Sequence, residues 1–552
     1  MKKSVRHILL LAALGYVFFM LGNGLLPLTD PDEVFYAETA KEMAARHEWN
    51  IPYIFGQPQF EKPVLIYWLL RAAFLAFGMT PFAARFFPAL FAMVGVIGVY
   101  LLASLGFKDK RKGFFAALCL MSSGLYIGLG RTVFTDMVFT VLILLAMLAF
   151  FWAYAREKRR DLGIVLFFFF CGLATLAKGP LGLVLPAASA TLFLSLRKEL
   201  RSFLRPSLAA GFAVFGVVCL PWYWYITARF GNSFIHEFFY NDHIRRVFFA
   251  EHAKNDRWYF YPASMVGLFF PWCFFLAAGF RRLWVSRGRL VPLQQLALCW
   301  LGVVFVVFQA AHSKLVSYIF PLFPALALVC GDFLGQWLRD DGKRGVRGGK
   351  VFLVTWGVLL LVPVAAIIAV PRLKFISLTL AGEERFIAAF MGWLLLLLLL
   401  FLRGRRSLAL YLVALAIPIV FLAMPVDRNQ IEPYFSTEKV SLFVRNHYSE
   451  SGPLMVSKSF ARGILYHSGR QVAIFGIGEK NYFSPHPVDF LDTEEKMSEF
   501  LRRNGTTYCV LRKKQVDELR KVCVRLGFVC EGPTVFGSSY LMRVGVTGGT
   551  PR

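Results

Sequence analysis

Charged residues are scarce in this chain, and their scarcity excludes most soluble folds. Only 17% of the 552 residues are Asp, Glu, Lys or Arg, whereas an ordinary soluble domain has about a quarter. Hydrophobic residues make up 57%, and Phe alone occurs 58 times. Because a soluble protein would have to expose much of that apolar surface, we expect a chain that crosses a membrane many times.

Several motifs are also missing. The sequence has no CxxC pair, no other zinc-ligand spacing, no Walker loop and no GxGxxG unit after a strand. These absences give no support to a zinc domain or to a nucleotide bound on the inner side. Cys509, Cys523 and Cys530 lie in the C-terminal region, and the sequence leaves a disulfide among them open.

Acidic residues are few relative to basic ones, with 34 Asp and Glu against 61 Lys and Arg and a formal charge of +27. In a soluble protein this excess would suggest nucleic acid as a partner. No nucleic-acid-binding pattern accompanies it here, and basic residues orient membrane spans by collecting in cytoplasmic loops. We therefore predict no nucleic-acid partner.

Apolar segments of about 20 residues predict thirteen membrane spans. Basic clusters fall in every second loop, beginning at Lys2, Lys3 and Arg6. This alternation places the N-terminus in the cytoplasm and the C-terminus outside, and the first span carries no small-residue cleavage site. The predicted spans are roughly 7–27, 82–106, 112–130, 136–155, 162–177, 180–196, 207–227, 259–280, 291–311, 315–337, 351–371, 386–402 and 407–425.

The spans divide the chain into two predicted domains. Residues 1–426 form the transmembrane domain, and its first outer loop, 28–81, contains a short apolar segment at 63–78. That segment is too short to span and has Arg71 at its centre, so we expect a helix on the outer membrane surface. Residues 427–552 alternate β-rich and helical runs, which predicts an outer α/β domain. It contains no catalytic motif.

The first outer loop begins with a group of acids. Asp30 suits an N-cap, Pro31 the first helical position and Glu33 the third, as in a capping box. Acids at a helix start also offset its dipole, which is a purely structural role. Asp32 is one carboxylate more than capping needs, so we favour it as a general base toward an acceptor hydroxyl.

Cations and further polar groups also lie in the predicted outer loops, on the same side of the membrane as these acids. Lys62, at headgroup depth, is suited to meet a phosphate, although Glu61 and Lys62 alone would be a weak surface ion pair. Two arginines in the fourth outer loop can grip a phosphate. Lys178 is a further candidate on this face, although a lysine at the end of a span can also simply extend its amine to the membrane interface. The other residues of this group are Asp136, Arg245, Arg246, His312, Lys314 and Tyr318.

These motifs resemble a known family. DPDEVFYAETAKEM followed by FEKPVLIYW is similar to the first outer loop of the GT-C glycosyltransferases of the aminoarabinose transferase (ArnT) and protein-mannosyltransferase-like group. LAKGPLGLVLP, KLVSYIFPLFP and HIRRVF resemble further segments of that family, and the likeness covers roughly residues 1–340. The chain departs from the pattern where Phe35 replaces the arginine of DExRYAE and Val316 the proline of KLPxY.

The resemblance implies an α-helical polytopic membrane protein of the GT-C type, in the bacterial inner membrane, with the active site and the C-terminal α/β domain in the periplasm. It also implies sugar transfer from a polyprenyl-phosphate (undecaprenyl-phosphate-type) donor to a lipid A-like lipid or a glycan acceptor. Glu61 matches a position near a metal in the family, so a divalent metal is left open, but we place no histidine partners for it. Candidate catalytic residues are Asp32, Asp136 and Glu33, and candidate substrate-binding residues are Lys62, Glu61, Tyr36, Lys178, Arg245, Arg246, Lys314 and Tyr318.

Two other classes of function remain open from the sequence. A polytopic transporter would place polar sites near the bilayer midplane, often between inverted repeats, whereas the ionisable residues here gather at the outer boundary and we find no obvious repeat. A different polyprenyl-lipid enzyme, such as a protein O-glycosyltransferase or a polysaccharide ligase, would differ in donor and acceptor.

Overall fold

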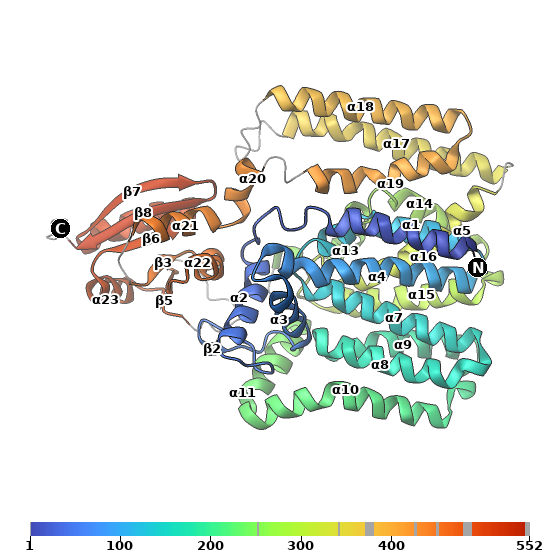
Figure 1. The fold of residues 1–552 in the computed structure, drawn as a ribbon, viewed down its shortest axis with the longest axis horizontal. Coiled ribbons are helices and arrows are strands. Elements are labelled where there is room, and N and C mark those ends of the chain that lie inside the picture. The colour runs from blue at the N-terminus through green and yellow to red at the C-terminus, as the bar shows by residue number, and fades with distance from the viewer. Residues whose placement is uncertain are drawn as a thin grey trace.

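The computed structural model describes residues 2–250, 253–339, 343–369, 380–423, 428–448, 452–477 and 488–546. It consists of a helical bundle followed by a smaller α/β domain (Figure 1). The predicted fold class, a polytopic α-helical protein with a C-terminal α/β domain, is confirmed. The predicted domain boundary at residues 426 and 427 lies outside the described residues.

Each predicted span coincides with a helix or a pair of helices. Over the described ranges, eight helices are long and apolar enough to cross a membrane, or up to ten if each bent pair is one span, so the count of thirteen stays a prediction. The predicted span ends at 370–371 and 424–425 are not among the described residues. The helices are α1 (Lys2–Gly15, continued by a π-helix, Tyr16–Met20), α4 (Pro81–Phe107), α5 (Lys110–Met121), α6 (Gly124–Gly130), α7 (Thr135–Ala155), α8 (Arg160–Lys178), α9 (Leu181–Leu196), α10 (Pro206–Phe230), α13 (Phe260–Leu268), α14 (Cys273–Val285), α15 (Pro292–Ala310), α16 (Phe323–Trp337), α17 (Lys343–Ala369), α18 (Leu380–Leu402) and α19 (Arg406–Ala423).

The two bent pairs have local causes. α5 and α6 meet at 67° where Ser122 and Ser123 donate their hydroxyls to carbonyls of the preceding turn, and such bonds bend helices. α13 and α14 meet at 118° around Pro271, which has no N–H to donate. Trp272 donates to Ser122 Oγ at 2.9 Å, so the two breaks pack against each other.

The first outer loop folds at the end of the bundle that faces the C-terminal domain (Figure 1). It contains α2 (Asp32–Ala45), a short hairpin of β1 (Tyr53–Ile54) and β2 (Gln57–Pro58), and α3 (Leu65–Phe77). α3 coincides with the predicted short helix at 63–78. α2 has no polar outer face, since most of its residues between Glu33 and Met43 are buried.

The start of α2 differs from the predicted capping box. Pro31 is the residue before the helix, and Asp30 makes no cap. Asp30 Oδ2 instead accepts hydrogen bonds from the amide and hydroxyl of Thr437 at 2.7 and 2.9 Å, because the C-terminal domain packs on this end of α2. The Glu33 carboxylate does accept a hydrogen bond from a backbone amide before the helix, but the donor is Thr29, at 3.0 Å, and not Asp30.

The fourth outer loop follows α10 as continuous helical turns. It comprises α11 (Asn232–Phe234), a π-helix over Ile235–Ile244 and α12 (Arg245–Phe248). π-helical turns are rare overall, and those that occur are often at functional sites. This one contains the ionisable residues Glu237, Asp242 and His243.

The C-terminal domain is a mixed sheet packed against helices. Within the described residues the sheet has six strands in the order β5-β4-β3-β6-β8-β7. β3, β4, β5 and β6 are parallel, and β8 runs antiparallel to β6 and β7. The elements are α20 (Arg428–Phe435), α21 (Glu438–His447), β3 (Leu454–Val456), α22 (Ala461–Ser468), β4 (Val472–Phe475), β5 (Phe490–Leu491), α23 (Glu494–Asn504), β6 (Thr507–Leu511), α24 (Lys513–Leu526), β7 (Phe528–Phe536) and β8 (Ser539–Val546).

The strand order creates a switch point between β3 and β6. From β3 the chain continues to β4 and β5 on one side, and β6 then lies on the other side of β3. The segments that follow β3 and β6 are joined, since the Arg512 amide donates to Ser457 Oγ at 2.9 Å. In open α/β sheets, ligands bind beyond the carboxyl ends of strands at such a point.

A disulfide joins Cys523 of α24 to Cys530 of β7, and Cys509 is free and buried in β6. The structure thus selects one of the pairings that the sequence left open.

Candidate active site

A cavity of about 1120 Å³ lies where the bundle, the first outer loop and the C-terminal domain meet. Its lining comes from the start of α2, the segment before α3, the ends of α7 and α8 and the fourth outer loop. The C-terminal domain contributes residues 457–459, Ala461, Arg462, Ile474, Arg512 and Gln515. The cavity is therefore closed by segments from across the whole sequence.

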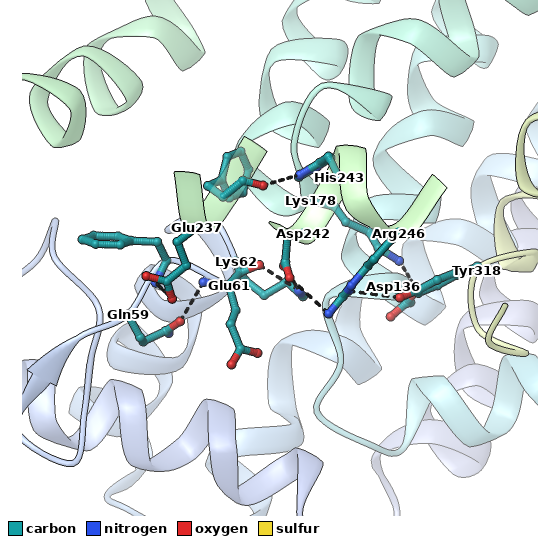
Figure 2. Close-up of polar contacts among 12 residues, drawn as sticks. Gln59, Glu61, Lys62, Asp136, Lys178, Glu237, Asp242, His243, Arg246 and Tyr318 are labelled. Carbon is teal, nitrogen blue, oxygen red and sulfur yellow. Dashed lines mark hydrogen bonds and ion pairs between the residues drawn. The ribbon is translucent and has the colours of Figure 1, made fainter. Parts of the chain in front are cut away.

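An ionic cluster of Lys62, Asp242, Arg246 and Tyr318 forms one part of the lining (Figure 2). Lys62 Nζ lies 2.9 Å from one oxygen of Asp242, and Arg246 lies 3.1 Å from the other. Arg246 also donates to the Tyr318 hydroxyl at 3.1 Å. Burial would raise the pKa of Asp242, but Lys62 and Arg246 hold it below its ordinary value. Asp242 is therefore ionised at neutral pH and lies between two cations.

A second ion pair adjoins this cluster. Asp136, in the first turn of α7, lies 2.5 Å from Lys178 Nζ at the end of α8. Lys178 Nζ also sits 5.0 Å from the centre of the Tyr318 ring. The turn after Lys178 needs glycine, because Gly179 has φ +104° and a Cβ there would lie 2.6 Å from His243 Nε2.

Asp32 is the carboxylate most open to the cavity. Its side chain lines the cavity and is exposed to it. Burial raises the pKa of Asp32, the charge of Arg462 lowers it, and nearby Glu61, Asp136 and Glu33 raise it further. A raised pKa makes a carboxylate a stronger base at neutral pH.

Glu61 contacts the C-terminal domain. Its Oε1 lies 3.4 Å from Arg462, and in Figure 2 its carboxylate points away from the ionic cluster. The Arg462 guanidinium also lies over the Phe35 ring, 4.3 Å from its centre. Arg462 thereby connects α22 to α2 through Phe35 and to the segment before α3 through Glu61.

Three of the predicted site residues do not line the cavity. Glu33 is completely buried and binds Arg85 at 2.6 Å, so its role in this structure is to hold elements together. Lys314 lies between α15 and α16 and pairs with Asp256, 2.6 Å away. Arg245 is one residue from Arg246 and so projects from a different face of α12. The predicted residues that do line the cavity are Asp32, Tyr36, Glu61, Lys62, Asp136, Lys178, Arg246 and Tyr318.

Further residues were not predicted as site residues. Glu237 accepts a hydrogen bond from the Phe60 amide at 3.5 Å, and burial raises its pKa to about 7. Asp242 was visible in the sequence only as a neighbour of the arginines. Lys458, Arg462 and Arg512 follow strands of a domain without a motif, and no sequence signal marked them.

The residues around Glu61 do not fit a metal site. Glu61 is paired with an arginine, and no group of three or more His, Cys, Asp or Glu side chains suited to a metal occurs over the described ranges.

Comparisons with known proteins match this architecture. Residues 61–225 match the family described as dolichyl-phosphate-mannose-protein mannosyltransferase. An undecaprenyl phosphate-alpha-4-amino-4-deoxy-L-arabinose arabinosyl transferase of Pseudomonas aeruginosa is 32% identical over 65% of this chain, which spans 64% of that relative. A second transferase of that name, from Pseudomonas fluorescens, is 28% identical over 94% of this chain and 89% of its own length.

Solved structures share the fold. ArnT from Cupriavidus metallidurans bound to undecaprenyl phosphate has a TM-score of 0.79 at 20% identity, with 99% of both chains covered. The Archaeoglobus fulgidus oligosaccharyltransferase has a TM-score of 0.54 at 15% identity, covering 94% of this chain and 69% of that one. The chain is thus similar in sequence to the arabinosyl transferases and, over residues 61–225, to the protein-mannosyltransferase family, and it shares the fold of ArnT.

Proposed function

We propose that this chain transfers a sugar from a polyprenyl-phosphate donor to a lipid A-like acceptor on the periplasmic side of the bacterial inner membrane. One observation carries the proposal: Asp32 shares a single cavity with an ionic cluster suited to a phosphate. The names of the relatives support the donor, since both contain undecaprenyl phosphate linked to an amino sugar.

The ionic cluster is the site for the donor phosphate. Lys62 and Arg246 can contact phosphate oxygens, while Asp242 holds both cations in place. Tyr318 adds a hydroxyl donor beside them. When the sugar leaves, negative charge grows on the phosphate, and preorganised cations stabilise that charge most in the transition state.

Asp32 acts as the general base. An oxygen of the acceptor hydroxyl forms a bond to the anomeric carbon of the sugar, and the bond from that carbon to the phosphate oxygen breaks. The bonding electrons leave with the polyprenyl phosphate, and the hydroxyl proton passes to Asp32. Asp136 is less suited to this role because Lys178 neutralises it.

Two features support a periplasmic site. The predicted charge alternation places the loops at the cavity end of the bundle outside, and the N-terminus lies at the opposite end (Figure 1). The C-terminal domain contains a disulfide, which is typical of oxidising compartments. The site at one end of the bundle also differs from the midplane site of a transporter.

The test uses the purified full-length protein in lipid nanodiscs. Asp32→Asn should lower kcat for sugar transfer by about 10²–10⁴-fold, as loss of a general base does, with undecaprenyl-phosphate affinity kept. Lys62→Gln should weaken undecaprenyl-phosphate binding. Lys254→Gln, an exposed lysine outside the cavity lining, is the matched control. Full turnover by Asp32→Asn, or solute transport without any sugar transfer, would refute the proposal.

A further inference from the structure

The fourth outer loop presents two carboxylates to the cavity from neighbouring turns of one helix. Glu237 and Asp242 both belong to the π-helix over Ile235–Ile244, and both line the cavity. A π-helix bonds each residue to the fifth one along the chain, so side chains five positions apart lie one turn apart on the same side. Glu237 therefore lies one turn before the acid that holds the ionic cluster together.

The two carboxylates have opposite electrostatic surroundings. Asp242 lies between two cations of the ionic cluster. Within the described residues, the Glu237 carboxylate has one hydrogen-bond partner, the Phe60 amide at 3.5 Å, and the charges that act on it are those of two other acids, Glu61 and Asp242. Burial and these two acids raise the pKa of Glu237 to about 7. Glu237 is thus a half-buried acid without a countercharge from the described part of the chain.

The cations of the membrane-domain lining are held by other acids. Lys62 and Arg246 contact Asp242 at 2.9 and 3.1 Å. Lys178 contacts Asp136 at 2.5 Å. A half-buried carboxylate without a countercharge either takes up a proton or pairs with a cation. The partner that suits Glu237 is therefore a positively charged group on a molecule that enters the cavity.

The position of Glu237 indicates which part of the donor it meets. In Figure 2, Lys62 is drawn between Glu237 and Arg246, so Glu237 lies beside the proposed phosphate site and not within it. One helical turn is about 5 Å, which is comparable to the width of a six-membered sugar ring. A sugar whose phosphate lies at the ionic cluster thus places a ring substituent near Glu237. The positively charged substituent that a sugar carries is a protonated amine.

We propose that Glu237 determines sugar specificity by binding the protonated amino group of an amino sugar on the donor. An ammonium and a carboxylate form a charge-assisted hydrogen bond, which is stronger than a neutral one. A neutral hydroxyl in the same place would leave the carboxylate without a countercharge. The proposal rests on the proposed glycosyltransferase function, because it names the class of sugar that the donor carries.

The segment beside Glu237 is held rigidly, which favours a positioned carboxylate. The Phe60 amide that donates to Glu237 follows Gln59, which is buried. The Gln59 side chain donates to the Tyr67 hydroxyl at 2.7 Å and accepts from the Glu61 amide at 3.0 Å. These bonds fix the backbone on both sides of the Phe60 amide, so the donor to the Glu237 carboxylate is fixed before a sugar binds.

The experiment compares two donors that differ in a single group. Full-length protein in nanodiscs receives undecaprenyl-phosphate-linked 4-amino-4-deoxy-L-arabinose, or L-arabinose on the same carrier with a hydroxyl in place of the amine. We measure kcat and KM for each donor with lipid A as acceptor, and the dissociation constant for undecaprenyl phosphate alone. Glu237→Gln removes the charge at nearly constant size, and Glu237→Asp keeps the charge. Glu495→Gln, an exposed acid outside the cavity lining, is the matched control.

We expect the wild type to have a lower KM for the amino donor than for the hydroxyl donor. Glu237→Gln should raise KM for the amino donor by about 10-fold or more, because a hydrogen bond to a charged group is lost. KM for the hydroxyl donor and the affinity for undecaprenyl phosphate should stay unchanged. Glu237→Asp should recover part of the preference, and Glu495→Gln all of it. An equal rise in KM for both donors, or a wild type without preference for the amine, overturns the proposal.

Donor binding without acceptor distinguishes this failure from failure of the proposed function. If the wild-type chain transfers no sugar, but Glu237→Gln weakens binding of the amino donor and not of the hydroxyl donor, the role of Glu237 stands and the glycosyltransferase proposal falls. If both donors are used equally well, the role of Glu237 falls alone. Undecaprenyl-phosphate binding shows that each variant is folded. Should Glu237→Gln fail this check, the wild-type preference between the donors and its change in Glu237→Asp decide the proposal.

Discussion

At the scale of single residues, three neighbouring acids have three different environments. Asp30 binds Thr437 of the C-terminal domain, and burial raises its pKa to about 7. Asp32 opens into the cavity, and Glu33 is locked to an arginine of α4. Only Asp32 is free to meet a substrate, because tertiary partners occupy the other two.

The pKa of Asp32 predicts how transfer depends on pH. A general base works only when deprotonated, so kcat should fall as the pH drops through the pKa of Asp32, which burial raises above its ordinary value. The positive charge of Arg462 lowers this pKa. Arg462→Gln should therefore raise the pKa and move the acidic limb of the kcat profile to higher pH.

The measurement is kcat against pH at saturating donor and acceptor for the wild type and Arg462→Gln. Arg502→Gln, on the exposed face of α23, should leave the limb in place. A limb that stays fixed in Arg462→Gln would mean that Asp32 is not the titrating base. The other groups that act on the Asp32 charge are Glu61, Asp136 and Glu33. None of them is substituted in the variant, and Glu61, which loses its ion pair with Arg462, would raise the pKa of Asp32 in the same direction.

The sequence predicted most of the membrane-domain site because its residues stand out chemically. Carboxylates and cations such as Asp32 and Lys62 are unusual beside apolar spans, so charge placement alone marked them. The same criterion also selected Lys314, which pairs with Asp256 and does not line the cavity. It missed Arg462 and Arg512, because charged residues are ordinary in an α/β domain and only the strand order directs these into the cavity.

At the scale of elements, Glu33 connects three parts of the bundle. Its carboxylate accepts two hydrogen bonds from Arg85 of α4 and one from the Val133 amide before α7. Arg85 also donates to carbonyls of the segment between α1 and α2, at Asn23, Leu26 and Pro27. Burial would raise the pKa of Glu33, but Arg85 and the amides hold it below its ordinary value.

Glu33→Gln should destabilise the protein by about 3–5 kcal/mol, because it leaves the Arg85 charge buried without its partner. Arg85→Gln should cost a similar amount, and the double variant should cost less than the sum, since neither charge then remains unpaired. Thermal unfolding in detergent micelles measures the three variants. Glu495→Gln, on the exposed side of α23, is the control. Strict additivity would contradict a direct pair.

Element boundaries were predictable where hydrophobicity is strong. The predicted spans coincide with helices or bent helix pairs. In residues 427–552, the β-rich runs LMVSKS, QVAIFG, TTYCVLRK and SYLMRV coincide with β3, β4, β6 and β8. α20, α22, β5 and β7 coincide with none of the predicted β-rich or helical runs. α22 is only eight residues long, β5 only two, and β7 is largely exposed, so neither length nor apolar pattern distinguishes them. The contact between the two helix breaks, in which Trp272 donates to Ser122, was not predictable because the two residues lie far apart in the sequence.

At the scale of the whole molecule, the cavity exists only because the two domains meet. The bundle alone would leave Asp32 and Glu61 in an open outer loop, and the C-terminal domain covers them with Arg462. Composition predicted both domains, but not their contact, because that contact depends on single pairs such as Asp30 and Thr437. The orientation of this assembly in the membrane remains a prediction from loop charge.

That orientation predicts that the cavity end of the bundle is exposed to the periplasm and the other end to the cytoplasm. Ala45 ends α2 beside the C-terminal domain, Lys108 follows α4 in a basic loop, and both are exposed. In intact cells, a membrane-impermeant maleimide should label Ala45→Cys, and it should label Lys108→Cys only after the inner membrane is opened. The unsubstituted protein gives the background, which should be low because most free cysteines are buried. Labelling of Lys108→Cys in intact cells, with Ala45→Cys protected, would invert the topology and place the cavity, with its proposed donor site, on the cytoplasmic side.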